Sequence, residues 1–482
     1  MSQDRVRDPA DLRNERLTES AFREERETVL AEHPYGETID LEEGAAFHHD
    51  HMADRNVARL LREAEAADDV LVQIMYGRTT PELHGEGWER AEAAGADILP
   101  TQVDSLTRTK DWAGTKEGIK QTRETGRSEL NGFPIVTHGV ETTREMVQRV
   151  DTPIELRATS TDLRLVAEVA FASGHSAFTN NPLYAGTNYN KDVPMWQVIR
   201  NWMYLYRLVS AYEERGVPIT IDCKPVLGGA PTPPSLNVAT MVLDLLLMAE
   251  QGVKNVAWVN RTQGNIVQAA ATARVMDRLG PEYLANAGHD NVRLYHNSSH
   301  WNGIWPEDEP PAWAVMNLNT AEALLAGANE IYIKTAVEGK GLPEVEDSLR
   351  AIRATRKAID VLSHQRLPDN DRVAAEADRI ERTARAIVDR VFDLGDGDLV
   401  QGDLAAIEAG VIDMPFPSSN ELAGDVLSMR DRENAVRYHD PGAIPVPDDV
   451  LAYHKERLAE RSAADDVDLD YDTIVADIKM FT

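Results

Sequence analysis

The sequence predicts an α/β fold, a TIM (β/α)8 barrel with an N-terminal helical segment and a C-terminal, mostly helical extension. From about residue 69, short apolar runs alternate with amphipathic stretches of helical period, the pattern of parallel βαβ units. About eight such units follow in one run, which favours a closed barrel over an open sheet. A chain of 482 residues, 42% hydrophobic and 27% charged, is long enough for one large barrel and an extension.

Residues 1–65 are predicted to form a polar helical segment before the barrel. Within it, the tract AFHHDHMAD brings together His48, His49 and His51. These three side chains cannot share one helical face, and no HExxH motif is present. We therefore expect a solvated helix end or turn there rather than a metal site.

The barrel is predicted to span residues 66–345. Nine segments have strand character, one more than a barrel needs: 69–76, 97–103, 132–137, 153–157, 176–180, 217–224, 255–260, 292–297 and 330–334. We reject 132–137 because Gly132-Phe133-Pro134 is a poor central strand. After Pro343 the pattern becomes mostly helical, and residues 346–482 are predicted to form a capping or partner-docking extension.

Three arginines, Arg78, Arg108 and Arg157, each end a strand candidate. After Arg157, Asp162 stands where a helix N-cap is expected, and Gly174 closes the helix that follows. One strand-end arginine is usually a surface ion pair, but three at one rim of a barrel indicate an anion site. The planar guanidinium holds carboxylate or phosphate through two hydrogen bonds. We favour a carboxylate because no glycine-rich phosphate loop follows the last strands.

Two lysines are further candidates. Lys334 ends an apolar strand with Glu338 four residues later, and Lys224 follows the run ITIDC. A strand-end lysine can pair structurally with a neighbouring acid, bind ligand hydroxyls or form a Schiff base, and spacing does not choose among these roles. Four aromatic residues are candidates either for pocket lining or for packing: Tyr184, Tyr189, His300 and Trp301.

Charge and composition exclude several classes of protein. The net charge is −31, only 11 of the 50 basic residues are lysine, and the acidic residues are dispersed along the chain. This pattern favours a protein kept soluble in a salty cytoplasm over a protein that binds a basic partner. Without a basic stripe we expect no nucleic acid binding. The longest apolar run, 241–250, is interrupted by Asp244, and the first sixteen residues contain no apolar signal, so we expect a cytoplasmic protein without a membrane span. The single Cys223 excludes an internal disulfide and a CxxC site.

Several stretches together resemble the epsilon (E) subunit family of glutamate mutase, also called methylaspartate mutase. They are collinear and cover nearly the whole chain: GADILPTQVDSLTR, GRSELNGFP, PIELRATSTDLRLVAE, PPSLNVATMVLDLLLMAEQGVKN, IYIKTAVEGKGLP, LGDGDLVQGDLAAIEAGVIDMPFPSSNELAG and RDRENAVRY.

This resemblance implies an isomerase, the large component of an adenosylcobalamin-dependent radical mutase that interconverts L-glutamate and (2S,3S)-3-methylaspartate. It also implies a small cobalamin-binding (sigma) subunit as partner, with two copies of each chain in a heterotetramer. The sequence contains no DxHxxG motif, so the lower histidine ligand of cobalt must come from that partner.

By matching positions, the resemblance implies roles for individual residues. Arg78, Arg108, Arg157 and Tyr189 match positions that bind the dicarboxylate substrate. Asn131, Lys334 and Glu338 match positions that meet the adenosyl part of the cofactor, and no residue of this chain is assigned to a metal.

Three positions depart from the family pattern. Ala158 replaces a histidine after Arg157, Thr179 stands where a carboxylate receives the substrate ammonium, and Ala185 replaces an active-site tyrosine, although Tyr184 is adjacent. The sequence thus leaves alternatives open: a related mutase for a different carboxylic acid, a non-catalytic scaffold for the cobalamin subunit, or an imine-forming lyase or aldolase that uses Lys224.

Overall fold

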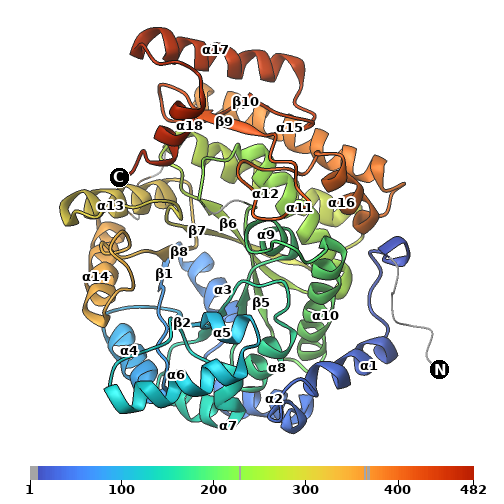
Figure 1. Ribbon diagram of the computed structural model, residues 1–482, viewed down its shortest axis with the longest axis vertical. Coiled ribbons are helices and arrows are strands. Elements are labelled where there is room, and N and C mark those ends of the chain that lie inside the picture. The colour runs from blue at the N-terminus through green and yellow to red at the C-terminus, as the bar shows by residue number, and fades with distance from the viewer. Residues whose placement is uncertain (1–8, 227–228, 363–364, 366–369) are drawn as a thin grey trace.

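The computed structural model describes residues 9–226, 229–362, 365 and 370–482. Its centre is one sheet of eight parallel strands in the order β1-β8-β7-β6-β5-β4-β3-β2 (Figure 1). The strands are β1 Leu71–Ile74, β2 Leu99–Gln102, β3 Ile154–Arg157, β4 Ala177–Thr179, β5 Thr220–Cys223, β6 Asn255–Arg261, β7 Arg293–Ser299 and β8 Glu330–Ile333. β1 pairs with β8 along its length, and a single bridge between Gln73 and Ile98 joins β1 to β2, so the sheet nearly closes into the predicted barrel.

Helices follow every strand and surround the sheet (Figure 1). They are α4 Pro81–Ala93, α5 Ser105–Arg108, α6 Trp112–Thr125, α7 Ile135–Val147, α8 Arg164–Ala172, α9 Pro182–Asn188, α10 Met195–Glu213, α11 Pro234–Gln251, α12 Ile266–Asn286, α13 Glu309–Leu325 and α14 Val345–Leu362. The strands are buried on both faces, which is why they read as short apolar runs in the sequence.

The segment before α7 agrees with the sequence prediction, whereas the start of α8 departs from it. α7 begins at Ile135, and only Phe133 bridges to Val103, so rejecting 132–137 is confirmed. The expected cap at Asp162 is wrong: α8 begins at Arg164 after Leu163. The Asp162 carboxylate, one residue before the cap, accepts from Arg164 N at 3.2 Å, and also from Lys110 Nζ at 2.8 Å and Arg164 Nη2 at 2.7 Å. Gly174 follows the helix with φ 101°, the left-handed backbone that suits glycine at a helix end.

The N-terminal segment packs beside the barrel and across its floor. Its elements are η1 Pro9–Asp11, α1 Glu19–Leu30, η2 Gly36–Thr38, α2 Leu41–Phe47, the short π-helix η3 His48–Met52, and α3 Val57–Ala67. α1 and α2 contact α8 and α10 (Figure 1). α3 covers the amino-terminal end of the barrel, where Leu61 packs with apolar side chains from five strands or their approaches: Leu71, Ile98, Ala177, Ala257 and Tyr295.

The histidines of the N-terminal tract make separate contacts with backbone carbonyl oxygens. His48 Nε2 is 2.9 Å from the Phe171 carbonyl oxygen, and His49 Nε2 is 2.9 Å from that of Arg215. Over the described residues, no group of three or more His, Cys, Asp or Glu side chains is placed to hold a metal ion.

The C-terminal extension is mostly helical and lies against one side of the barrel, at the top of Figure 1. It comprises α15 Asp371–Leu394, α16 Leu399–Glu408, β9 Leu427–Arg430, β10 Val436–Asp440, α17 Asp448–Asp465 and α18 Tyr471–Ile478. α15 and α16 cover α11, which explains why that helix is apolar on nearly all sides. The antiparallel β9–β10 pair was not expected from the sequence. In the described part of the chain, no helix has the length and apolarity to cross a membrane.

Candidate functional site

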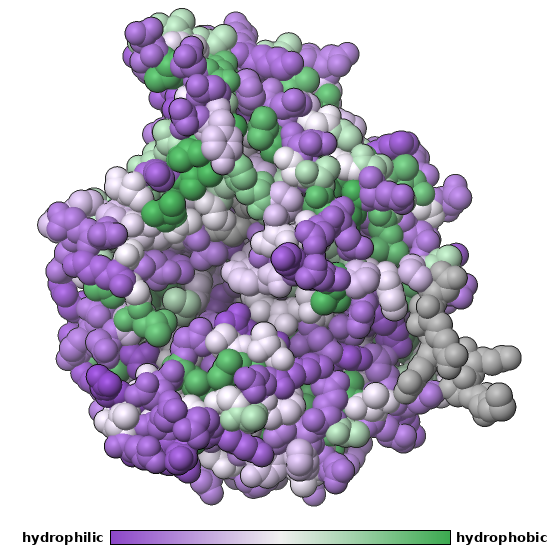
Figure 2. All heavy atoms as spheres, in the orientation of Figure 1, coloured by the Kyte–Doolittle hydropathy of each residue, from purple (hydrophilic) through white to green (hydrophobic). Residues whose placement is uncertain are grey.

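A cavity of about 160 Å³ opens at the carboxyl-terminal end of the barrel. Figure 2 shows the corresponding face of the molecule, hollowed near its centre. Five cationic side chains line the cavity: Arg108, Arg157, Lys224, Arg261 and Lys334. Parallel strands carry their loops to this end, where active sites of such barrels form.

Arg157 is the last residue of β3 and is only 2% exposed. Its Nη1 donates to Glu155 Oε1 at 2.8 Å and to Gln73 Oε1, and lies 3.5 Å from Asp222 Oδ2. The guanidinium also stacks 3.6 Å from the centre of the Tyr332 ring. Burial opposes the charge, but the carboxylates of Glu155 and Asp222 outweigh it and raise the pKa of Arg157.

Arg108 lines the same cavity but does not end a strand. β2 stops at Gln102, and Arg108 is the last residue of the short helix α5. The expectation of a strand-end position is therefore wrong, because Asp104 Oδ1 caps a helix by accepting from Leu106 N at 2.9 Å and Thr107 N at 3.0 Å. Among the described residues, the Arg108 guanidinium makes only long hydrogen bonds of 3.4 Å, to the carbonyl oxygens of Asp104 and Thr159.

Arg78 lies elsewhere. It stands four residues beyond the end of β1 and lines a separate cavity of about 440 Å³ with Leu342 and Pro343. Its Nη2 donates to the Pro343 carbonyl oxygen at 2.7 Å and lies 3.7 Å from Glu344 Oε2. The structure thus brings Arg108 and Arg157 together in one cavity and leaves Arg78 outside it.

The residues predicted to meet the cofactor lie at the rim. Lys334 follows β8 directly, lines the cavity, and its Nζ donates to Glu338 Oε1 at 2.6 Å. Asn131 is exposed, and its Oδ1 accepts from Ser105 N at 2.9 Å, which holds the start of α5. Neither Asn131 nor Glu338 lines the cavity itself.

Two cations of the cavity were not assigned to substrate binding from the sequence. Lys224, considered only for imine chemistry, follows β5 and is 8% exposed. Burial and the nearby Arg157 charge lower its pKa. Arg261 is the last residue of β6, the same strand position as Arg157, and that signal was present in the sequence. Its Nε donates to Ser299 Oγ at 3.3 Å, and its guanidinium lies 5.7 Å from the centre of the Tyr184 ring.

Of the four aromatic candidates, Tyr184, Tyr189 and His300 line the cavity. The rings of Tyr184 and Tyr189 are 5.6 Å apart, and Tyr189 is 47% exposed at the mouth. Trp301 instead packs 5.5 Å from Phe481 of the C-terminal extension. Burial lowers the pKa of His300 to about 3, so this imidazole is neutral at physiological pH.

Beneath the cavity lies a buried cluster of acids. Glu155 Oε2 accepts from Gln73 Nε2 at 2.6 Å, and Glu330 Oε2 accepts from Asn297 Nδ2 at 2.5 Å. Burial and the Glu155 charge raise the pKa of Asp222 to about 7. The cluster therefore offsets the charge of Arg157 from below.

Three polar atoms of the cavity residues have no hydrogen-bond partner among the described residues although they are buried. They are Arg157 Nη2, Thr179 Oγ1 and Asn180 Oδ1. Leaving such atoms unpaired is costly, so their gathering at one cavity indicates a site that a ligand completes.

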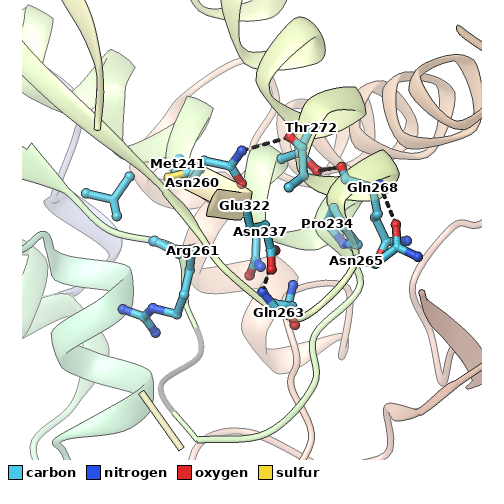
Figure 3. Close-up of a pocket in the computed structure, with 13 residues that line it drawn as sticks. Pro234, Asn237, Met241, Asn260, Arg261, Gln263, Asn265, Gln268, Thr272 and Glu322 are labelled. Carbon is cyan, nitrogen blue, oxygen red and sulfur yellow. Dashed lines mark hydrogen bonds between the residues drawn. The ribbon is translucent and has the colours of Figure 1, made fainter. Parts of the chain in front are cut away.

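A further, smaller pocket of about 10 Å³ lies between β6 and the helices α11 and α12 (Figure 3). Glu322 lies in the wall of this pocket, where its carboxylate oxygens accept hydrogen bonds from Gln263 N at 2.8 Å and Gly264 N at 2.9 Å. In Figure 3 the Arg261 guanidinium points away from the other labelled side chains. This pocket has room for about one water molecule and is not a substrate site.

Comparison with known proteins gives one family. Residues 52–482 match the model of the methylaspartate mutase E chain. A glutamate mutase epsilon subunit from Desulfitobacterium hafniense is 34% identical, with 97% of each chain covered. Proteins of the same name from Halobacterium salinarum and Haloarcula marismortui are each 35% identical; the first match covers 97% of both chains. The second covers 92% of this chain and 90% of the relative.

Proposed function

Because the chain belongs to the methylaspartate mutase E chain family, we propose that it is the substrate-binding component of an adenosylcobalamin-dependent carbon-skeleton mutase, an isomerase. The observation that supports this most directly is the cavity at the end of the barrel, where Arg108 and Arg157 face one space of about 160 Å³. L-Glutamate, rearranged to (2S,3S)-3-methylaspartate, is the first substrate to test.

In this proposal Arg108 and Arg157 each hold one carboxylate of the substrate, and Tyr189 closes the mouth. A radical rearrangement needs little acid–base chemistry, but it needs a fixed substrate and exclusion of water. Arg157 suits this role because its Nη1 is fixed by Glu155 and Gln73 while its buried Nη2 has no partner among the described residues. Each charge-assisted hydrogen bond of this kind contributes roughly 1.5–3 kcal/mol.

Lys334, Glu338 and Asn131 would hold the adenosyl part of adenosylcobalamin. The Lys334 ammonium donates and the Glu338 carboxylate accepts, a donor set that fits the hydroxyl groups of a sugar. When bound, adenosylcobalamin supplies the radical that takes a hydrogen atom from the substrate. A small cobalamin-binding subunit is the proposed partner, two copies of each chain forming the complex.

A substrate role for Arg78 requires the 342–345 segment to move, because its guanidinium now binds the Pro343 carbonyl oxygen. Arg78→Ala tests this role: a raised KM for substrate supports it. An unchanged KM assigns Arg78 to the loop alone.

The test of the proposal uses the full chain, its cobalamin-binding subunit, adenosylcobalamin and L-glutamate in concentrated KCl. Methylaspartate ammonia-lyase converts product to mesaconate, whose ultraviolet absorbance gives the rate. Mesaconate formation that requires both chains supports glutamate mutase activity. Absence of turnover and of cobalt–carbon cleavage with any dicarboxylic acid would leave a scaffold role, and borohydride trapping of a carbonyl compound on Lys224 would favour a lyase.

A second candidate, a mutase for a different carboxylic acid, is favoured by a specific observation. Thr179 and Ala158 line the cavity at positions where the family carries a carboxylate and a histidine. Thr179 thereby removes the carboxylate that would bind an amine, and Ala158 adds space where the family has a larger side chain.

A further inference from the structure

From the charges around the cavity we infer that the substrate is a dicarboxylic acid carrying a neutral hydroxyl group in place of an ammonium group. This inference rests on the proposed function and narrows it to a class of substrate. Three sets of atoms support it: the cations that line the cavity, the acid cluster beneath the cavity, and the neutral oxygens of Thr179 and Asn180.

The wall is strongly positive. Besides Arg108 and Arg157, it carries Lys224 and Arg261 on the opposite side. Lys224 directly follows β5, and Arg261 is the last residue of β6. Lys224 Nζ lies 5.4 Å from the centre of the Tyr332 ring, the same ring that stacks on Arg157. Such a space attracts two carboxylates and repels an ammonium group.

Among the described residues that line the cavity, none is Asp or Glu. The carboxylates that contact lining residues are already paired with cations: Glu155 and Asp222 face Arg157 at 2.8 Å and 3.5 Å, and Glu338 accepts from Lys334 Nζ at 2.6 Å. A buried ammonium group without its own carboxylate is left unpaired, and this is strongly unfavourable. The cavity therefore lacks the group that an amino acid substrate requires.

Two neutral side-chain oxygens of the cavity lining are available for a ligand. Thr179 Oγ1 and Asn180 Oδ1 are buried without partners among the described residues, whereas Asn180 Nδ2 donates to the Ala158 carbonyl oxygen and to Thr159 Oγ1. Asn180 has φ 96°, a backbone conformation that costs free energy in a residue other than glycine and often accompanies a binding role. A hydroxyl group can donate one hydrogen bond to such an oxygen and accept another, with no charge to balance.

The first experiment compares two ligands that differ only in this group, L-glutamate and L-2-hydroxyglutarate. Their affinities for the purified chain are measured by isothermal titration calorimetry in concentrated KCl. We expect 2-hydroxyglutarate to bind at least tenfold more tightly, about 1.4 kcal/mol. Equal affinity, or tighter binding of glutamate, would overturn the inference.

A pair of variants at one position tests the missing carboxylate. Thr179→Glu supplies a charge where an ammonium group would lie, and it should shift the preference toward L-glutamate by tenfold or more. Thr179→Gln adds nearly the same volume without the charge and should leave the preference for 2-hydroxyglutarate in place. A shift of equal size in both variants would contradict the role of charge, and circular dichroism verifies that each variant is folded.

A second pair tests the added cation. Lys224→Met should weaken 2-hydroxyglutarate binding at least tenfold and bring the two affinities closer together. The control is Lys357→Met on α14, an exposed lysine whose Nζ lies 3.5 Å from Asp360 Oδ2. It removes the same charge far from the cavity lining and should change neither affinity. Unchanged binding in Lys224→Met would count against the inference.

Cobalt–carbon cleavage in the complete mixture separates this inference from the proposed function. Cleavage triggered by L-glutamate and not by 2-hydroxyglutarate would refute the substrate class while the mutase proposal stands. Tight binding of 2-hydroxyglutarate to the chain, without cleavage for any acid, would refute the mutase proposal while the ligand class stands. Cleavage with 2-hydroxyglutarate alone supports both.

Discussion

Arg157 has two distinct sides. One nitrogen, Nη1, is committed to Glu155, Gln73 and Asp222 beneath the cavity, and the other, Nη2, is buried without a partner in the described structure. The side chain is therefore held in place before any ligand arrives, at the cost of one unsatisfied donor. Arg108 lacks this support, since its contacts are long ones to carbonyl oxygens.

Arg157→Ala should abolish turnover and also destabilise the protein by roughly 3–5 kcal/mol, because Glu155 and Asp222 lose their buried partner. The stability loss follows from guanidinium chloride unfolding, and turnover from the mesaconate assay.

Arg108→Ala is the matched comparison. It should lose activity and ligand affinity to a similar degree while unfolding within about 1 kcal/mol of the parent protein, because among the described residues its hydrogen bonds are 3.4 Å long and it forms no close ion pair. Equal destabilisation by the two substitutions would contradict the distinction between them.

The end of β2 is held by close backbone packing. A Cβ atom on Gly132 would meet Gln102 O and Asp104 N, both at 2.5 Å, so the 128–134 loop lies against the strand end. The same loop carries Asn131, whose Oδ1 accepts from the first residue of α5. The position of Arg108 at the end of α5 thus depends on a glycine in a different segment.

Gly132→Ala should push this loop from β2 and weaken dicarboxylate binding at least tenfold, as α5 moves with Arg108. Gly126→Ala is the control: its φ of 71° imposes a backbone cost of about 1–2 kcal/mol, but no atom lies within 4 Å of the added Cβ. Calorimetric titration of both variants measures the difference, and comparable loss of affinity would disprove the link.

Within α11, Asp244 is buried against Asn181 and Leu183. Burial raises its pKa from the usual 3.8 to about 8, although hydrogen bonds from those residues oppose the shift. The folded protein therefore keeps a proton that the unfolded chain releases, so this group lowers the free energy of unfolding as pH rises from 3.8 to about 8.

Asp244→Asn should remove this dependence. Between pH 5 and pH 8, the parent protein is expected to lose stability relative to the variant, as measured by denaturant unfolding at each pH. Asp393→Asn, an exposed change on α15, should run parallel to the parent protein. Parallel curves for Asp244→Asn as well would show that Asp244 is ionised throughout.

The individual elements differ in how far the sequence predicts them. The eight strands were predicted because each is buried on both faces and flanked by helices, and Gly132-Phe133-Pro134 ruled out the ninth. The β9–β10 pair was missed because its strands are short and carry charged residues whose contacts lie far away in the sequence: Arg430 N donates to Asp477 Oδ2 at 2.7 Å, and Arg437 Nη1 donates to Glu376 Oε1 at 2.6 Å. α5 was missed because Asp104 stops the strand and caps a helix within what read as one run.

Only part of the candidate site could be predicted. Position along a strand indicated Arg157 and Lys334, and the same signal was available for Arg261. The location of Arg78 depends on the Pro343 carbonyl oxygen, 265 positions away, and nothing local in the sequence reports that contact. Likewise, local sequence does not show that Thr179 Oγ1 is buried without a hydrogen-bond partner among the described residues, because this depends on how the strands pack together.

The net charge of −31 should make the stability of the assembled molecule depend on salt. We expect the melting temperature to rise with KCl concentration, because screening reduces repulsion among the dispersed acids. Scanning calorimetry at increasing KCl measures this, and the triple variant Glu145→Gln, Asp290→Asn, Asp389→Asn should show a smaller rise. A melting temperature independent of KCl would instead favour a basic partner as the reason for the acidity.

Helix α3 seals the amino-terminal end of the barrel through Leu61 and its apolar neighbours. Small molecules then enter and leave at the opposite end, which the cobalamin subunit is proposed to cover. Under that arrangement the acid has to bind first and the corrinoid subunit second, and product departs only after the two chains separate. Turnover would be paced by association between subunits, so dilution of the complex should slow it even with saturating acid.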